Sequence, residues 1–434
     1  MPTINFDRKS LQVLDLLENK NEHVFLTGNA GTGKSTLLDH FRNHTKKNIA
    51  VVAPTGVAAV NVRGETIHSF FSFPPNITPE HAAYTAKKTK KTKIYLALEI
   101  LIIDEISMVR ADLLDSIDSF LRSVRKTNLP FGGVRLIMVG DLHQLSPVVT
   151  NSEQESLAKL YPSPYFFSSR VFGKLLDGLY SQFIFIELQT IYRQTDKVFI
   201  DILNRLRNKQ TTSEDLRRLN QRLAEEGDFL DDHILLTAIN DQADKINELR
   251  LNQISGPHYS FHATVSGDFS LKQSPAADTV LVKTGARVML LNNDPDNRWI
   301  NGTLGTLHKA ETNYVYVKID GGSTEKIEPV TWTTYQTVFN SEKQILESHE
   351  VGSFRQLPLR LAWAITIHKS QGKTFDKVAI DLGRGAFAHG QTYVALSRCT
   401  SLSGLKLIRP LEEQSIIMDT RVIDFLKSLR PLAV

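Results

Sequence analysis

Short apolar runs alternate with helical patterns along the first half of the chain. Four of these runs are rich in apolar and β-branched residues, as strands buried in parallel sheets are: His23–Thr27, Ile49–Ala53, Leu98–Ile103 and Arg135–Gly140. Between the third and fourth runs, Asp112–Lys126 places its apolar residues at helical spacing on one face. This alternation predicts βαβ units with a parallel sheet, in which phosphate sites lie at the carboxyl ends of the strands.

A second alternating segment begins near Phe183, and a β-rich stretch interrupts it. We expect strands at Phe183–Leu188, Ile234–Thr237 and Val378–Leu382, and helices at Val198–Lys209, Ser213–Glu226 and Gln242–Gln253. Between about 300 and 355, short alternating runs flank the Gly321-Gly322 turn, which is typical of a small antiparallel β module. The pattern therefore predicts two α/β domains, the second of which carries a β insert.

Composition is that of an ordinary globular protein. The 434 residues suggest two to four domains of roughly 100–200 residues, and 41% hydrophobic residues suffice for sizeable cores. No apolar run reaches the roughly 18 residues of a membrane-spanning helix, and no targeting segment is visible. The single cysteine, Cys399, excludes a disulfide framework and a cysteine-based metal cluster. We expect an intracellular protein, cytoplasmic in a bacterium, without membrane contact.

The net charge of +4 is too small to indicate nucleic-acid binding by itself, but basic residues gather locally. Residues 81–97 contain no acid and five lysines, which are Lys87, Lys88, Lys90, Lys91 and Lys93. A run of this kind is commonly a solvated surface, and it is also what a phosphate backbone attracts. Both interpretations stay open on charge alone.

A glycine-rich loop follows the first predicted strand and opens a helix. Residues 28–35, GNAGTGKS, match G-x-x-x-x-G-K-[ST], and the strand–loop–helix context is that of a phosphate-binding P-loop. Glycines let backbone N–H groups close around phosphates, Lys34 reaches the β- and γ-phosphates, and Ser35 is a ligand for Mg²⁺. A glycine-rich turn without function is a much weaker interpretation, because pattern and context coincide. ATP and Mg²⁺ are the expected cofactors.

Polar residues also follow two later strands. The run 101–103 ends in Asp104, a candidate Mg²⁺ ligand, and Glu105, a candidate to polarise the attacking water. An Asp-Glu pair alone more often begins a helix, but after a P-loop and on a buried strand it favours hydrolysis over binding. Residues 140–147, GDLHQLSP, follow the next strand, where Gln144 is placed to sense the γ-phosphate.

Two arginines are candidates to complete this site from the second domain. Arg193 lies in LQTIYRQ and Arg398 in YVALSR, and the second domain has no P-loop of its own. Guanidinium groups on the transferred phosphate strongly accelerate phosphoryl transfer. Isolated arginines are more often surface ion pairs. If the two domains face each other across a cleft, however, these arginines make closure depend on ATP.

Groups suited to single-stranded nucleic acid lie in three segments, 53–59, 66–71 and 364–372. They supply hydroxyl groups, backbone amides and aromatic rings, which bind phosphates and stack on bases. Outside a motor, each histidine here would more often be structural. Two further candidates, Thr237 and Asn240, lie at the first strand of the second domain. The candidate contacts are therefore Pro54, Thr55, Gly56, His68, Phe70, Thr237, Asn240, Thr366, His368, Lys369, Ser370 and Gln371.

In chain order, the segments resemble the motif series of superfamily 1 helicases of the 5′-to-3′ subclass. They are GNAGTGKS, APTGVAAVNVRGETIHSFF, LIIDEISM, GDLHQLSPV, IYRQ, AITIHKSQGKTFDKV and YVALSRC. Residues 111–133, which begin with ADLLD and end with PFGG, look like the signature of the petite integration frequency (PIF) helicases. The resemblance covers about residues 5–410.

The resemblance implies an α/β fold with two RecA-like parallel-sheet motor domains, a small wedge insert and an SH3-like β insert. The implied bounds are 1–71 and 98–180 for the first motor domain, 72–97 for the wedge, 181–299 and 356–434 for the second motor domain, and 300–355 for the SH3-like insert. The lysine run falls in the wedge, so we expect it to act where the strands of a duplex separate.

The resemblance also implies the residues of the nucleotide site. The family carries a glutamine near the N-terminus that reads adenine. Gln12 lies close to that spacing and Ser10 at it, so selectivity for adenine stays open. The expected nucleotide-binding residues are Gln12, Gly28, Asn29, Ala30, Gly31, Thr32, Gly33, Lys34, Ser35, Thr36 and Gly372, with Lys34, Glu105, Gln144, Arg193 and Arg398 as catalytic candidates and Ser35 and Asp104 as metal ligands.

Three classes of function remain. The first is a monomeric, ATP-dependent DNA helicase of repair and recombination. It moves 5′-to-3′ on single-stranded DNA and unwinds tailed or forked duplex, with quadruplexes and RNA–DNA hybrids left open as substrates. The second is a single-strand translocase that remodels protein–DNA complexes without unwinding. The third, a P-loop kinase or GTPase, fits least: a kinase would lack the series His68, 366–371 and Arg398, and no N/T-K-x-D base-reading motif follows a strand.

Overall fold

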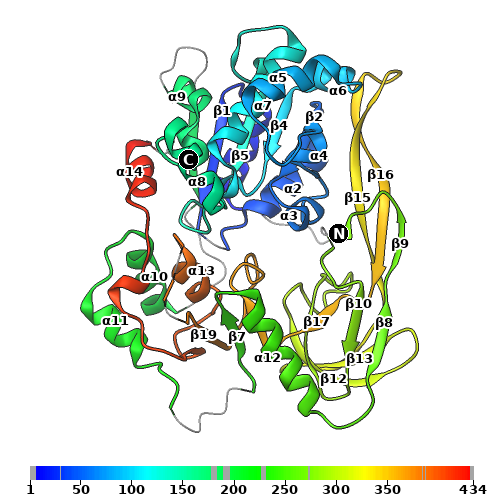
Figure 1. Ribbon diagram of the computed structural model, residues 1–434, viewed down its shortest axis with the longest axis vertical. Helices are drawn as coiled ribbons and strands as arrows, with labels where there is room; N and C mark the ends of the chain where they lie inside the picture. The colour runs from blue at the N-terminus through cyan, green and yellow to red at the C-terminus, as the bar shows by residue number, and fades with distance from the viewer. Residues whose placement is uncertain are drawn as a thin grey trace.

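The computed structural model describes most of the chain. The described residues are 6–29, 31–176, 183–188, 196–225, 231–271, 274–383, 385–386 and 388–430, without the side chains of Asn151 and Ser152. Two α/β units lie one above the other, and a β-rich module stands beside them (Figure 1). Within these residues, no helix is both long and apolar enough to cross a membrane.

A six-stranded parallel sheet, in the order β3-β2-β4-β5-β1-β6, forms the first domain. Its strands are β1 (His23–Gly28), β2 (Ile49–Ala53), β3 (Glu65–Thr66), β4 (Ile100–Ile103), β5 (Arg135–Val139) and β6 (Phe183–Leu188). The four strands predicted in the first half are confirmed. The strand β6 was expected in the second domain, beyond a boundary at residue 180. It instead pairs with β1 from His23↔Phe183 to Gly28↔Leu188, so the first sheet continues to Leu188.

Helices cover both faces of this sheet because alternate strand residues point to opposite sides. Val24 and Leu26 pack with α1 and α2, whereas Phe25 lies in the core beneath α7. The helix predicted at 112–126 is confirmed as α7. The helices of this domain are α1 (Arg8–Asn19), α2 (Lys34–His44), α3 (Gly56–Asn61), α4 (Ile67–Phe71), α7 (Ala111–Arg125), α8 (Asn151–Leu160) and α9 (Arg170–Leu176).

The insert expected at 72–97 is helical. It consists of α5 (Pro79–Lys88) and α6 (Thr92–Ala97), and Ala82 and Ala86 are buried in the core that contains α7. Small side chains at these two positions let α5 lie close to α7. The lysines of the run are on the outside: Lys87, Lys88, Lys90 and Lys93 are exposed and Lys91 is half-buried.

The second α/β domain contains a four-stranded parallel sheet in the order β18-β7-β19-β20. The strands are β7 (Ile234–Thr237), β18 (Ala364–Thr366), β19 (Val378–Asp381) and β20 (Leu405–Leu407). The helices are α10 (Lys197–Arg207), α11 (Ser213–Asn220), α12 (Asn240–Gln253) and α13 (Gln391–Leu396). The strands predicted at 234–237 and 378–382 and the three predicted helices are confirmed, although α11 ends earlier than expected.

The β module extends on both sides of the segment expected at 300–355. Its largest sheet has the order β14-β13-β12-β11-β17, in which β11 and β17 flank that segment and pair with each other. Two smaller sheets, β10-β8 and β15-β16-β9, complete it. The strands are β8 (Tyr259–His262), β9 (Thr264–Gly267), β10 (Thr279–Val282), β11 (Arg287–Leu290), β12 (Leu304–Ala310), β13 (Val315–Ile319), β14 (Thr324–Ile327), β15 (Val330–Asn340), β16 (Ile345–Gln356) and β17 (Leu359–Leu361).

Two segments from the second half of the chain reach the first domain (Figure 1). The long β15–β16 hairpin runs up to α6, and the Thr337 N–H donates to Glu65 Oε1 at 2.6 Å. The last helix, α14 (Thr420–Ser428), was expected with the second motor domain. Its Phe425 instead stacks on Phe167 at 4.2 Å and joins the first domain's core.

Candidate active site and nucleic-acid interface

The P-loop connects β1 to α2 as the sequence predicts. Gly28 has φ +154°, and a Cβ atom there would lie 2.6 Å from the Leu188 carbonyl oxygen, so only glycine fits between the loop and β6. Gly33 has φ +82° and caps α2, a conformation that disfavours residues with a Cβ. The Thr32 hydroxyl donates to the Asn29 carbonyl at 2.9 Å. Ala30 lies outside the described residues.

Lys34 lies among carboxylates at the start of α2. Its Nζ donates to the carbonyl oxygens of Gly28 at 2.7 Å and Asn29 at 3.0 Å. Burial lowers the pKa of Lys34, and the charges of Asp141, Glu105 and Asp104 oppose that change. The loop, the helix N-terminus and this cation together fit a polyphosphate, because each of them favours negative charge.

The two acids after β4 are set in different backbone conformations. Asp104 is 9% exposed, and burial raises its pKa. The backbone of Glu105 adopts the left-handed conformation, with φ 51°. Burial and the neighbouring Asp104 charge raise the pKa of Glu105 to about 7, while Lys34 acts in the opposite direction. The first two residues after Lys34, Ser35 and Thr36, are exposed at the same end of α2.

Gln371 comes from the second domain and lies at the acids of the first. Its Nε2 donates to Glu105 Oε2 at 3.3 Å and to Gln144 Oε1 at 3.4 Å. Gln144 in turn donates to Asp141 Oδ2 at 3.1 Å. Gln371 was expected among the DNA contacts, and here its amide is placed between the two residues that were expected to act on water and on the γ-phosphate.

Arg398 is fully buried behind this contact. Its guanidinium donates to Val394 O at 2.9 Å, Lys373 O at 3.2 Å, Ser370 O at 3.4 Å and Ser397 Oγ at 2.9 Å. Its charge also acts on Glu105, where it lowers the carboxyl pKa. The second candidate, Arg193, lies outside the described residues.

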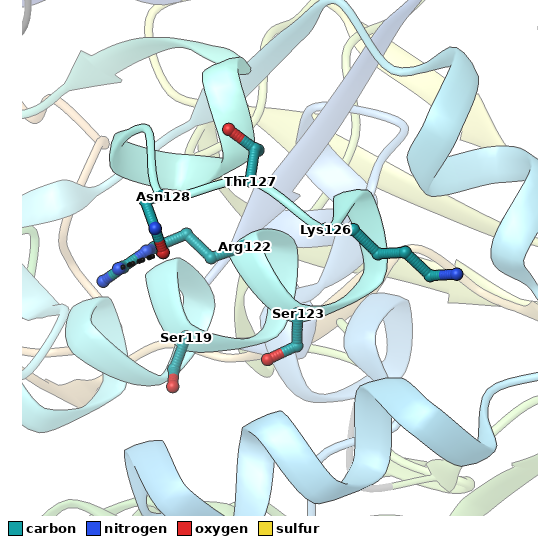
Figure 2. Close-up of a pocket in the computed structure, with 6 residues that line it drawn as sticks. All are labelled: Ser119, Arg122, Ser123, Lys126, Thr127 and Asn128. Atoms are coloured by element: carbon teal, nitrogen blue, oxygen red, sulfur yellow. Dashed lines mark hydrogen bonds between the residues drawn. The ribbon is translucent and has the colours of Figure 1, made fainter.

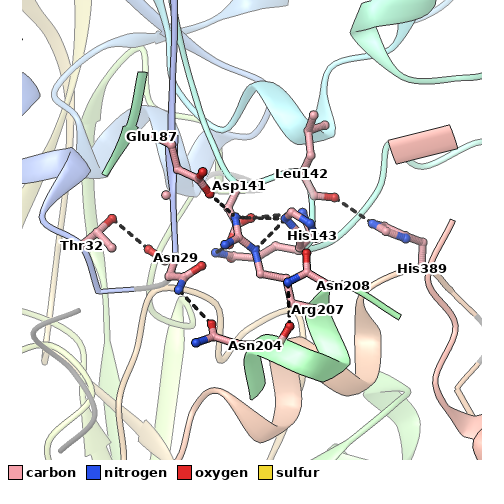
Figure 3. Close-up of polar contacts among 12 residues, drawn as sticks. Asn29, Thr32, Asp141, Leu142, His143, Glu187, Asn204, Arg207, Asn208 and His389 are labelled. Carbon is pink, nitrogen blue, oxygen red and sulfur yellow. Dashed lines mark hydrogen bonds and ion pairs between the residues drawn. The ribbon is translucent and has the colours of Figure 1, made fainter. Parts of the chain in front are cut away.

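The sequence did not single out Arg207, which joins the two domains at this site (Figure 3). This side chain from α10 is 7% exposed, and its Nε donates to His143 Nδ1 at 2.8 Å. Its Nη2 lies 3.4 Å from Glu187 Oε1 and 3.7 Å from Asp141 Oδ1. Burial alone would raise the pKa of Asp141, but the charge of Arg207 holds it well below its usual range.

A second contact from α10 reaches the P-loop. The Asn29 amide donates to Asn204 Oδ1 at 3.3 Å, one helical turn before Arg207 (Figure 3). The helix α10 therefore contacts both the P-loop and the loop that contains Asp141 and Gln144. An arginine in a helix carries no signal in the sequence that distinguishes this role from a surface ion pair.

Two other predicted nucleotide contacts are exposed. Gln12 is exposed on α1, and Gly372 is exposed next to Gln371 with φ +78°. A polar pocket of about 450 Å³ lies elsewhere, at the carboxyl end of α7 (Figure 2). It contains none of the predicted site residues; its lining is Ser119, Arg122, Ser123, Lys126, Thr127 and Asn128.

In the first domain, the candidate DNA contacts lie around two short helices. Thr55 caps the start of α3, and its side chain accepts a hydrogen bond from the Ala58 N–H. Its neighbours Pro54 and Gly56 are half-buried, as Thr55 is. His68 is half-buried in α4, and burial lowers its pKa. Phe70 differs from expectation, because it is 1% exposed and packs against Tyr95 in the core. Its ring supports α4 and does not offer a face for stacking on a base.

In the second domain, hydroxyl groups shape a turn and basic side chains are exposed on it. Thr366 Oγ1 accepts the Lys369 N–H, and Ser370 Oγ donates to the Ile367 carbonyl. His368 and Lys369 are exposed. Thr237 is buried at the end of the adjacent strand, and Asn240 is exposed at the start of α12. Residues 366–373 run from these basic side chains to Gln371, which contacts Glu105, and to Lys373, whose carbonyl oxygen accepts a hydrogen bond from Arg398. We call residues 366–373 the coupling turn.

The candidate strand contacts of the first domain lie near the β15–β16 hairpin. A pocket of about 110 Å³ lies between them, and Thr66, Ser69, Thr334 and Gln336 are among its lining residues. The strand-binding candidates of the first domain therefore lie next to the hairpin in this arrangement.

Comparisons with known proteins identify the family of the chain. The PIF1-like helicase family model matches residues 11–216. The chain is 33% identical to the ATP-dependent DNA helicase Pif1 of Bdellovibrio bacteriovorus, over 99% of this chain and 93% of that protein. It is 34% identical to human ATP-dependent DNA helicase PIF1 over 95% of this chain, and it spans 62% of that longer protein.

Solved structures of a relative distinguish two arrangements. Bacteroides sp Pif1 in complex with ADP-AlF4 matches with a TM-score of 0.89 at 37% identity, covering 98% of this chain and 97% of the relative. The same relative bound to single-stranded DNA has the same identity and coverage, but its TM-score is 0.65. The unliganded relative matches with a TM-score of 0.88. The parts of this chain are thus arranged more as in the unliganded and ADP-AlF4 structures than as in the strand complex. By its sequence over nearly its whole length and by its fold, the chain belongs to the PIF1-like helicase family.

Proposed function

We propose that this ATP-dependent DNA helicase moves 5′-to-3′ along a single strand and separates the duplex ahead of it. The observation that supports this most is the coupling turn. Exposed His368 and Lys369 are on one part of the turn, and Gln371 reaches Glu105 and Gln144 from another. A shift of the turn on strand binding would therefore move groups at the ATPase site. Strand separation on tailed duplexes tests this proposal.

Each domain contributes different groups to ATP hydrolysis in this proposal. Lys34 and the P-loop bind the phosphates, Glu105 orients the attacking water, and Gln144 senses the γ-phosphate. Ser35 and Asp104 would hold Mg²⁺, and the ion would supply positive charge to the phosphates. Arg398, and Arg193 outside the described residues, would stabilise the transferred phosphate from the second domain. Since its substrate is DNA, we also propose an intracellular site of action.

We propose domain bounds that follow the sheets and cores described above. The first motor domain comprises residues up to 71, 98–188 and the α14 helix, and the wedge is 72–97. The second motor domain comprises 196–253 and 364–411, and the β module between them runs from β8 to β17. A monomer acting on tailed or forked duplex is the simplest motor that these parts provide.

Arg207→Ala is expected to lower kcat for DNA-stimulated ATP hydrolysis by about 10- to 100-fold. The reason is that small displacements of catalytic groups are costly, and Arg207 fixes the loop of Asp141 and His143. Steady-state ATPase assays across ATP concentrations measure kcat and KM separately. Arg205→Ala is a matched control, because Arg205 lies on the same helix and pairs only with Asp215 of its own domain among the described residues. Equal activity of both variants would contradict the role of Arg207.

Replacing the five wedge lysines by alanine is expected to lower duplex unwinding several-fold more than single-strand-stimulated ATPase. Four of them are exposed, and they would attract phosphates at the point where strands separate. Parallel unwinding and ATPase assays measure the ratio. A control variant replaces three exposed lysines of the β module, Lys309, Lys318 and Lys326. Equal losses in both assays would place the wedge lysines on the general tracking surface, and no loss would make them a solvated surface only.

A further inference from the structure

Three basic side chains gather where the second parallel sheet meets the β module. Arg360 comes from β17, and Lys369 and Lys373 belong to the coupling turn after β18. Burial, followed by the charge of Arg360, lowers the pKa of both lysines, so each lysine lies within electrostatic reach of Arg360. We call these three residues the cation cluster.

The cation cluster carries more positive charge than its surroundings balance. Asp244 is the one carboxylate whose charge acts on Arg360 or Lys369 among the described residues. None of the three cations forms an ion pair with a described carboxylate, although such pairs are frequent elsewhere on this chain. The local excess is therefore two positive charges, three cations against one acid.

Neutral oxygens hold the cluster in place. The Arg360 guanidinium donates to the Pro275 carbonyl, and its Nε is buried without a hydrogen-bond partner among the described residues. Lys373 Nζ donates to Asn301 Oδ1. The Lys373 side chain lies against Gly302, where a Cβ atom would be 3.3 Å from the Lys373 Cβ. Two cations are thus fixed in position by groups that carry no charge.

This arrangement is unfavourable until an anion joins it. Burial, followed by repulsion from Arg360, lowers the pKa of Lys373 to about 8, and burial lowers the pKa of Arg360. Like charges that have lost part of their hydration raise the free energy of the structure, and a bound anion between them would offset this. The unpartnered Nε of Arg360 is a further donor for such an anion.

We propose that the cation cluster binds a phosphodiester group of the translocating single strand, at the junction of the second motor domain and the β module. This inference rests on the proposed function, and it adds Arg360 and Lys373 to the expected strand contacts. A strand is favoured over a free phosphate because Lys369 and the exposed His368 belong to the same turn. The phosphodiester would pass from His368 and Lys369 towards the β module.

A phosphodiester at this position would also act on the ATPase site. The carbonyl oxygens of Ser370 and Lys373 both accept hydrogen bonds from Arg398. A strand that pulls on the Lys373 side chain therefore changes the position of a backbone group that holds this arginine. Lys373 would thus contact the strand with its side chain and Arg398 with its backbone carbonyl oxygen.

The test measures how the affinity for single-stranded DNA depends on salt. A fluorescent oligothymidine is titrated with the wild type and with the variants Arg360→Gln, Lys373→Gln and their combination, at several salt concentrations. Each phosphate contact contributes about 0.7 to the slope of log Kd against log salt for single strands. We expect the double variant to lose about that much slope and to bind about 3- to 10-fold more weakly at low salt.

The controls separate this site from general effects of charge and folding. Lys377→Gln removes an exposed lysine four residues after Lys373 that pairs with Asp232, and it should keep the wild-type slope. Lys369→Gln alters an exposed member of the cluster without risk to the fold and should reduce the slope as well. Thermal melting of every variant shows that a lower affinity is not a loss of structure.

Two results would overturn the inference. One is a wild-type salt slope in the double variant. The other is that the cluster binds only free phosphate. In that case inorganic phosphate at constant ionic strength would protect the wild type, but not the double variant, from thermal unfolding, and both proteins would bind the strand equally. Absence of strand binding by the wild type would contradict the proposed function itself, a result distinct from both.

Discussion

Arg398→Ala is expected to lower kcat for ATP by about 10³-fold or more while changing ATP affinity much less. Guanidinium groups that stabilise a transferred phosphate are worth about 10³–10⁵ in rate in other phosphoryl-transfer enzymes. Arg398 is positioned for this by the carbonyl oxygens of Val394, Ser370 and Lys373, and its charge reaches Glu105. Single-turnover ATP hydrolysis and fluorescent-nucleotide binding measure the two quantities separately.

A buried arginine also contributes to folding, so a second variant is needed. Arg398→Lys keeps a positive charge but not the planar group that donates in several directions, and it should recover stability more than rate. Melting temperatures of both variants provide the comparison. Hydrolysis at the wild-type rate in a folded Arg398→Ala variant would show that this arginine does not act at the site.

Glu105→Gln is expected to bind ATP and Mg²⁺ nearly as the wild type does and to hydrolyse ATP about 10²–10⁴-fold more slowly. The substitution keeps the size of the side chain and removes the carboxylate that would accept a proton from water. It also leaves Asp104 and Ser35 unchanged for the metal. Nucleotide titrations and pre-steady-state hydrolysis measure the two effects. Parallel loss of affinity and rate would instead make Glu105 a metal ligand.

A matched variant isolates the contact that Gln371 makes with Glu105. Gln371→Ala removes the amide that lies 3.3 Å from Glu105 Oε2 but retains the carboxylate. We expect it to weaken the stimulation of ATPase by DNA more than hydrolysis without DNA, because the amide connects the coupling turn to the acid. Its comparison with Glu105→Gln separates coupling from chemistry.

The parts of the site that depend on local sequence were predictable. The P-loop requires Gly28 and Gly33 at fixed positions in the chain, and strand β4 requires an apolar run before Asp104 and Glu105. Each is a short-range pattern whose physical meaning does not depend on distant residues. For the same reason, α7 was predicted to within one residue at each end.

Partners that are distant in sequence were not predictable in the same way. The apolar run of β6 marks it as a buried strand, but nothing in it says that it pairs with β1 rather than with the second sheet. Phe425 is one apolar residue of an amphipathic helix, and only the fold shows that it stacks on Phe167. The domain bounds that the resemblance implied were therefore displaced at β6 and α14.

Side-chain direction explains the remaining differences within the site. Gln371 and Lys369 are two residues apart in one turn, yet one faces the ATPase acids and the other faces solvent. Arg207 becomes identifiable as an interdomain contact only when α10 is placed against Asp141 and His143. A motif names the segment that carries function, whereas the turn geometry decides which side chain serves which ligand.

The most direct test of the proposed motor compares duplexes with a single-stranded tail at one end. Wild-type protein is mixed with ATP and with duplexes of the same sequence that carry either a 5′ or a 3′ tail, and strand separation is followed by fluorescence. A Lys34→Ala variant, which lacks the phosphate-binding amine, is the control for ATP-independent melting. We predict ATP-dependent separation of the 5′-tailed duplex and little of the 3′-tailed one. Separation of the 3′-tailed duplex alone, or of both at equal rates, would contradict the proposed direction of movement.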